Sequence, residues 1–294
     1  MACRSRRVPL PGGLGCHLLE WGGEDPALDH TVVLLHGMLE NAWGWEETVE
    51  AGLAGRFHVV AADFRGHGDS DRVGGGGGYY FPDYLADLHE LIPLVARGRL
   101  SLVGHSLGGA IAGLYAGTCP EGIFRLVLIE GTGLPTTVAG PPRMAKWLEG
   151  RARVRARPQR SYGSLDEAAQ RLRDGDPELG PERARRLAEK GTARGPDGRL
   201  RFKHDPRLTA GRPCAFDVEN ARRFWANVGC PVLIVEGAQS DFRLPEEEGR
   251  RRWSSFARWR SVVVPGTGHM VPRHQPQALA RLLVDFLEEG TEPR

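Results

Sequence analysis

The chain is organised around six short apolar runs separated by segments with helical periodicity. The runs cover residues 31–35, 57–62, 100–103, 126–129, 231–236 and 261–264. Nearly continuous apolar character over so few residues is typical of strands covered on both faces, as in a parallel sheet. Between them, segments 82–96 and 278–287 place their apolar residues on one helical face. This alternation predicts an α/β fold with a mostly parallel, doubly wound sheet.

The alternation of strands and helices stops between residues 135 and 225. Residues 136–225 carry 21 Lys and Arg against 12 Asp and Glu, a net charge of +9 within a chain whose total is +2. We therefore predict a core domain made of residues 1–134 and 226–294, and a helical cap inserted as residues 135–225. The cap is expected over the carboxyl edge of the sheet, where open α/β sheets bind their ligands.

The overall composition limits the partners. A net charge of +2 gives no reason to expect binding to nucleic acid or to a membrane surface. The five cysteines are scattered without a CxxC pair, which argues against a disulfide framework or a structural zinc site. No secretory signal and no apolar window long enough to span a membrane is visible. We expect a cytoplasmic protein that acts on a small molecule and needs no metal or cofactor. Its oligomeric state is left open.

The sharpest motif is GHSLGG at residues 104–109. It follows an apolar run and precedes a small-residue helical segment, which is the context of a nucleophile elbow. Ser106 is then held at a tight turn, with the amide groups of a helix N-terminus around it. A serine hydroxyl is a poor nucleophile by itself, so a base must lie within hydrogen-bond reach.

The base and its acidic partner are expected later in the chain. His269 follows the run at 261–264 and precedes the last helix, so it lies where a strand ends. Asp241 lies in the loop after the run at 231–236 and completes the order Ser…Asp…His. Glu130, at the end of the run at 126–129, is the alternative acid. We predict Ser106, Asp241 and His269 as the catalytic triad.

Two backbone N–H groups are needed to stabilise an oxyanion. Leu107, directly after the nucleophile, provides one. Met38, in the HGMLEN loop after the first run, provides the other. His105, Gly37 and Met270 flank these residues in the sequence and are the candidates for lining the substrate pocket.

The segment DFRGHGDS at residues 63–70 contains three charged residues, Asp63, Arg65 and Asp69. Such a set can hold a metal or act as an acid/base pair. A turn braced by local hydrogen bonds explains it equally well, because short polar side chains bond readily to nearby backbone. We predict the structural role.

Together these motifs resemble the α/β-hydrolase superfamily. HGM, DFRGHGDS, GHSLGG, GAQSD and GTGHM occur in that family's order and span most of residues 30–290. HGMLENAWGWEE and RFKHDPRL also resemble the serine hydrolase-like (kraken-like) group, whose members are cap-bearing serine hydrolases. The resemblance implies the triad Ser106, Asp241 and His269. A serine at position 106 argues against epoxide hydrolases and haloalkane dehalogenases, which carry aspartate there.

We accordingly predict a carboxylesterase-like serine hydrolase that cleaves an ester or related acyl bond through an acyl-enzyme. Three alternatives remain open: a C–C bond hydrolase, a perhydrolase of the haloperoxidase kind, and a non-catalytic ligand-binding homologue. The arginine-rich cap has two interpretations, a solvated surface or a site for acidic acyl groups and phosphorylated carriers.

Overall fold

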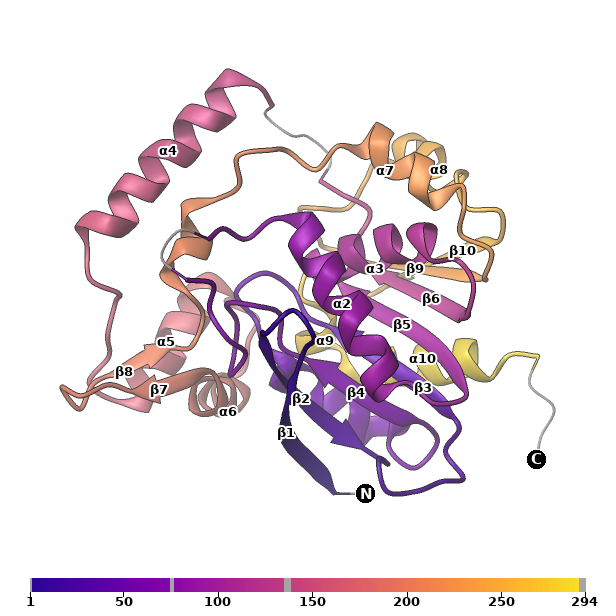
Figure 1. The fold of residues 1–294 in the computed structure, drawn as a ribbon, viewed down its shortest axis with the longest axis horizontal. Helices are drawn as coiled ribbons and strands as arrows, with labels where there is room; N and C mark the ends of the chain where they lie inside the picture. Colours follow the sequence, from indigo (N-terminus) through magenta and orange to yellow (C-terminus); the bar gives the residue numbers. More distant parts are fainter. Residues whose placement is uncertain (1, 75–76, 135–138, 291–294) are drawn as a thin grey trace.

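A computed structural model describes residues 2–74, 77–134 and 139–290. Its centre is an eight-stranded sheet in the order β1-β2-β4-β3-β5-β6-β9-β10 (Figure 1). The strands are β1 (Cys3–Pro9), β2 (Gly15–Trp21), β3 (His30–Leu35), β4 (His58–Ala62), β5 (Arg99–His105), β6 (Ile123–Ile129), β9 (Val232–Gly237) and β10 (Trp259–Val264). All six predicted strands are present, and the mostly parallel α/β sheet is confirmed.

The sequence analysis missed the first two strands. β1 and β2 form an antiparallel hairpin, and β2 pairs antiparallel with β4, whereas the other neighbours in the sheet are parallel. β1 carries arginines on both of its faces, at positions 4, 6 and 7, so its apolar pattern is broken. An edge strand with one solvated face gives a weaker sequence signal than a strand buried on both faces.

Helices cover both faces of the sheet. One face packs against α2 (Phe81–Val95) and α3 (Leu107–Thr118), and the other against α10 (Pro276–Glu288) and the short turns η1 (Ala42–Trp45), α1 (Glu46–Thr48) and η2 (Val49–Leu53). Alternate residues of each central strand enter the two cores, as the pleat of a strand requires. Two further helices, α8 (Glu246–Trp253) and α9 (Val271–His274), follow β9 and β10.

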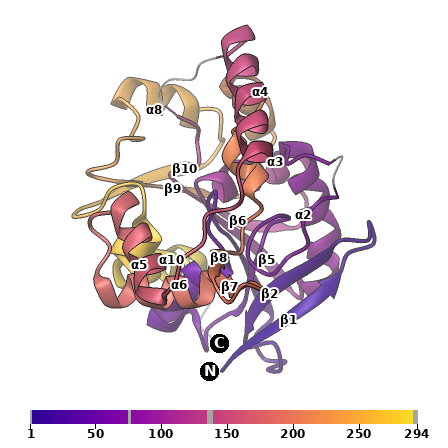
Figure 2. The same cartoon turned by 90° about the vertical axis from the view of Figure 1, so that its left-hand side faces the viewer.

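The chain between β6 and β9 leaves the sheet and returns to it (Figures 1 and 2). It forms α4 (Pro141–Ala156), α5 (Leu165–Gly175), α6 (Pro181–Gly191), the hairpin strands β7 (Thr192–Arg194) and β8 (Leu200–Phe202), η3 (Pro206–Ala210) and α7 (Val218–Trp225). α5, α6 and the hairpin enclose a small apolar core of their own, while α4 stands apart from them. The predicted cap is thus not purely helical.

The last helix of this segment belongs with the core layers. Trp225 of α7 lies in the same apolar cluster as α3, and a Cβ atom at Gly117 would lie 2.0 Å from the Phe224 carbonyl oxygen. The predicted boundary at 225/226 therefore falls at the end of a helix that packs on the core, and the extent of the cap stays a prediction. Its other boundary, at 134/135, adjoins residues 135–138, which lie outside the described residues. Within the described ranges, no helix combines the length and the apolar character needed to cross a membrane.

Candidate active site

Backbone strain is concentrated at the carboxyl edge of the sheet. Among residues 2–74, 77–134 and 139–290, the non-glycine residues with positive φ are Leu39 (64°), Ser106 (52°) and Glu130 (52°). They follow β3, β5 and β6, three neighbouring strands. Such conformations cost about 1–3 kcal/mol each and persist at functional sites, where the surroundings enforce them. This edge is therefore the candidate active site.

Ser106 lies at the turn from β5 into α3, with φ 52° and ψ −111°. Its amide donates to the Ile129 carbonyl at 2.8 Å, and within the described residues its hydroxyl has no hydrogen-bond partner. Gly108 allows the turn to approach β3, because a Cβ atom there would lie 2.2 Å from the Leu35 carbonyl oxygen. The local sequence thus forms the elbow that the GHSLGG motif predicted.

His269 lies against Glu130. The His269 Nδ1 is 3.3 Å from Glu130 Oε2, and the Glu130 side chain is only 1% exposed. The same carboxylate accepts the Gly237 amide at 2.7 Å and the Ser240 hydroxyl at 2.8 Å. The Glu130 side chain is therefore buried, and both of its carboxylate oxygens have hydrogen-bond partners.

Of the two candidate acids, Glu130 and not Asp241 lies within hydrogen-bond distance of His269 Nδ1. Asp241 is exposed, and it forms no hydrogen bond or ion pair with any residue in the described ranges. The next residue, Phe242, turns toward His269 instead, with ring centroids 4.4 Å apart. The loop after β9 contributes donors to Glu130 rather than an acid, because Ser240 and the Gly237 amide reach its carboxylate.

The two predicted oxyanion donors lie on loops that are bonded to each other. The Gly108 amide donates to the His36 carbonyl at 3.1 Å and so joins the elbow to the HGMLEN loop. In the part of the chain that the structure describes, the amides of Met38 and Leu107 donate to no other residue. Both remain available to a bound ligand.

A buried ionic network beneath these loops was not predicted. Glu40 Oε2 accepts the Gly37 amide at 2.7 Å and His105 Nδ1 at 2.8 Å, and Arg273 lies 2.9 Å from Oε1. Burial raises the pKa of Glu40, but the charges of Arg273 and His105 outweigh it and hold the pKa below its usual value. The sequence feature that could have indicated this network is Glu40 itself, an acid three residues after Gly37, close enough along the chain to accept the Gly37 amide.

The network also reaches the loop that carries His269. His105 Nε2 donates to the His269 carbonyl at 2.9 Å, and the two rings lie 5.0 Å apart. Both partners of His105, a carboxylate and a carbonyl, are acceptors, so both ring nitrogens donate only in the cationic form. On the far side, Arg273 and His274 contact Asp176 after α5, at 3.6 and 2.8 Å. The network therefore spans the HGMLEN loop, the elbow, the histidine loop and the inserted segment.

The charged residues of the DFRGHGDS segment have structural partners. Asp63 Oδ1 accepts the Ala42 amide at 2.6 Å, and Oδ2 accepts the Asp69 amide at 2.8 Å and His17 Nδ1 at 2.7 Å. His17, Asp63 and Asp69 come close enough together to be considered as metal ligands. The hydrogen bonds of Asp63 explain the cluster as a brace for the turn, in line with the predicted structural role.

Two cavities open beside Met38. One, of about 240 Å³, lies between α4 and residues 77–80. The other, of about 530 Å³, lies toward α5 and includes Met270 and Arg273. Of the three predicted pocket residues, Met270 lines a cavity, whereas His105 and Gly37 are buried and line neither. Their role in the structure is to hold the loops through Glu40.

Comparison with known proteins agrees with this architecture. A model described as the alpha/beta hydrolase family matches residues 32–282. A serine hydrolase-like protein of Danio rerio is 29% identical over 292 residues, covering 96% of this chain and 87% of that protein. A 3-hydroxybutyrate-oligomer hydrolase of Cupriavidus necator is 30% identical over 277 residues, 89% of each chain. The crystal structure of a hypothetical protein from Pseudomonas aeruginosa PAO1 superposes with a TM-score of 0.82, at 29% identity over 97% of this chain and 99% of that one.

Proposed function

The chain belongs to the alpha/beta hydrolase family, and on that premise we propose that it is a serine esterase with Ser106 as nucleophile, His269 as base and Glu130 as the orienting acid. The observation that carries the proposal is the contact between the buried Glu130 carboxylate and His269 Nδ1, at the sheet edge where Ser106 is strained. A serine, a base and an oriented acid on one edge are the parts that acyl transfer requires.

The proposed reaction begins with attack of Ser106 Oγ on the substrate carbonyl. The Glu130 carboxylate accepts a hydrogen bond from His269 Nδ1–H, which keeps the proton on Nδ1 and leaves Nε2 unprotonated, so that Nε2 takes the proton from the serine hydroxyl. The imidazolium that forms is stabilised by the Glu130 carboxylate. His269 then protonates the leaving alcohol, and an acyl-enzyme remains. Water, deprotonated by His269, releases the acid and restores Ser106.

The developing oxyanion accepts hydrogen bonds from the backbone amides of Met38 and Leu107. Both are free of other acceptors in the described chain, and each such donor lowers the barrier by about 3–4 kcal/mol. Leu107 begins α3, so the positive end of the helix dipole adds to the stabilisation. The relative from Cupriavidus necator supports ester chemistry, because its name describes hydrolysis of a hydroxy-acid oligomer.

The test is turnover of p-nitrophenyl acetate together with labelling by a fluorophosphonate probe. We expect the wild-type protein to show both activities and the Ser106→Ala variant to lose both, with turnover falling by about 10⁴-fold or more. Thermal melting of the two proteins controls for folding. Wild-type turnover in the folded Ser106→Ala protein would refute the nucleophile. Absence of labelling in the wild type would favour a ligand-binding protein without catalysis.

A further inference from the structure

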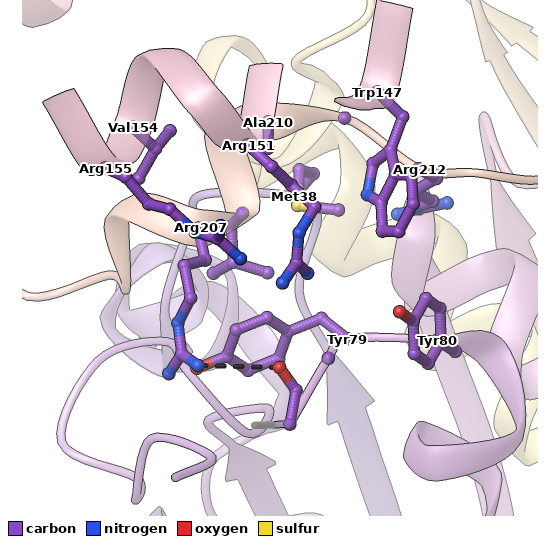
Figure 3. Close-up of a pocket in the computed structure, with 14 residues that line it drawn as sticks. Met38, Tyr79, Tyr80, Trp147, Arg151, Val154, Arg155, Arg207, Ala210 and Arg212 are labelled. Carbon is purple, nitrogen blue, oxygen red and sulfur yellow. Dashed lines mark hydrogen bonds between the residues drawn. The ribbon is translucent and has the colours of Figure 1, made fainter. Parts of the chain in front are cut away.

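The smaller of the two cavities is lined by four arginines, one of which is paired with an acid. We call it the Arg212 cavity and define it by Met38, Tyr79, Tyr80, Trp147, Arg151 and Arg212 (Figure 3). Arg155 and Arg207 also line it, and no Asp or Glu does. Arg207 is neutralised by Asp205 at 2.6 Å. Arg212 and Arg151 have no acidic partner in the described residues.

Aromatic rings orient the two unpaired guanidinium groups. Arg212 Cζ lies 4.7 Å from the centre of the Phe81 ring, and Arg151 Cζ lies 5.1 Å from the centre of the Trp147 ring. Figure 3 shows Arg151 reaching from α4 into the space above Tyr79. Stacking uses the face of a guanidinium and leaves its N–H edge free. The rings therefore hold the two guanidinium groups in place, while the N–H donors of both groups stay free for a ligand in the cavity.

The position of Arg212 distinguishes this cavity from the arginine-rich surface around it. Burial lowers the pKa of Arg212 below its ordinary value, yet an arginine stays charged at neutral pH. By contrast, Arg153, Arg157 and Arg160, which line the larger cavity, are exposed to water. Arg212, by comparison, is only partly exposed, and a partly buried cation without a counterion is costly unless an anion binds beside it.

From these contacts we infer that the Arg212 cavity binds a carboxylate on the acyl part of the substrate, which makes the protein a hydrolase of short dicarboxylic half-esters. The inference rests on the proposed function, because Met38 both lines the cavity and supplies the oxyanion amide. A cavity of about 240 Å³ is smaller than the ~300–1,000 Å³ of typical ligand pockets, so the acyl chain must be short. The planar fork of arginine suits a carboxylate bound through two N–H groups.

The test compares two esters of the same shape, mono-p-nitrophenyl succinate and the neutral p-nitrophenyl 4-methylpentanoate, at fixed ionic strength. We expect the wild-type kcat/KM for the anionic ester to exceed that for the neutral one by roughly tenfold or more, the size of a charged hydrogen bond. Arg212→Gln removes the preference, Arg212→Lys retains part of it, and Arg151→Gln reduces it. The neutral ester changes by less than about twofold, since its acyl group makes no charged hydrogen bond.

The matched control is Arg223→Gln. Arg223 is an exposed residue of α7 that lines neither cavity, so this variant loses the same charge without touching the site. We expect it to keep the wild-type preference. Equal kcat/KM values for the two esters in the wild type, or a preference unchanged in folded Arg212→Gln, would overturn the inference. A preference lost equally in Arg223→Gln would also overturn it, because the effect would then come from net charge.

A binding measurement separates this inference from the proposed function. The Ser106→Ala protein is titrated calorimetrically with monomethyl succinate and, separately, with inorganic phosphate. Binding of the half-ester that Arg212→Gln abolishes supports the site even if the wild type hydrolyses no ester. No binding, in an enzyme that hydrolyses the neutral ester, overturns the site and leaves the esterase intact. Binding of phosphate without monomethyl succinate overturns the carboxylate assignment.

Discussion

The carboxyl edge of the sheet and the inserted segment above it differ in whether their charged side chains have partners within the protein. At the edge, Glu130 and Glu40 are buried, and every one of their oxygens has a partner. In the inserted segment, Arg212 and Arg151 are held by aromatic rings without an acid. Charges that pair within the protein fix the geometry of the loops that meet at this edge. Charges left unpaired beside a cavity are available to a ligand.

The strongest test of this comparison separates the two candidate acids. We expect Glu130→Gln to lower kcat for p-nitrophenyl acetate by about 10³–10⁴-fold, because an amide can hold His269 in the wrong tautomer. Asp241→Asn is the matched control, and it should stay within about threefold of wild type, since an exposed side chain without partners contributes little. Steady-state kinetics at pH 8 measures both. The reverse result would restore Asp241 as the acid.

A second prediction concerns the ionic network under the loops. Glu40→Gln removes the carboxylate that faces both Arg273 and His105, and within the described residues Arg273 keeps only Asp176 at 3.6 Å, so we expect the free energy of unfolding at pH 7 to fall by about 3 kcal/mol. The pKa of Glu40 is lower in the folded than in the unfolded protein. Its contribution is therefore present above about pH 4.5, the ordinary value, and is lost as the pH falls below it. Urea unfolding at pH 7 and at pH 4 measures both effects.

The control for this prediction is Glu246→Gln. Glu246 pairs with Arg250 on the surface of α8 and its side chain is 81% exposed. The same chemical change should then cost less than about 0.5 kcal/mol at either pH. If the two variants lose equal stability, or if the loss in Glu40→Gln is larger at pH 4 than at pH 7, the network does not act as described.

The smallest expected effect is at an exposed ion pair of the inserted segment. Arg185 pairs with Asp166 between α6 and α5, and the two side chains are 56% and 78% exposed. We expect Arg185→Gln to change the free energy of unfolding by less than about 0.5 kcal/mol, because water screens the pair. Thermal melting in low and high salt checks this. A loss above 1 kcal/mol would mean that the inserted segment depends on internal ion pairs as the sheet edge does.

Much of the fold was predictable because its signals are local. Buried parallel strands are short apolar runs, and the elbow is a contiguous motif, so β3 to β6, β9 and β10 and the turn at Ser106 were found from sequence alone. β1 was missed because arginines lie on both of its faces, and β2 because the buried polar residues His17 and Glu20 interrupt its apolar run. Likewise, the apolar residues of α7 gave no indication that they pack on α3.

The sequence by itself determined the parallel strands of the sheet, the turn at Ser106 and the position of the histidine loop, because each depends on neighbours in the chain. Only the tertiary structure decided which acid meets His269, since Glu130 and Asp241 both follow a strand and differ in where their side chains point. The tertiary structure also decided which arginines, Arg212 and Arg151 among them, have no acidic partner in the described residues. Pairing between residues a hundred positions apart depends on distance in space, and no local pattern records it.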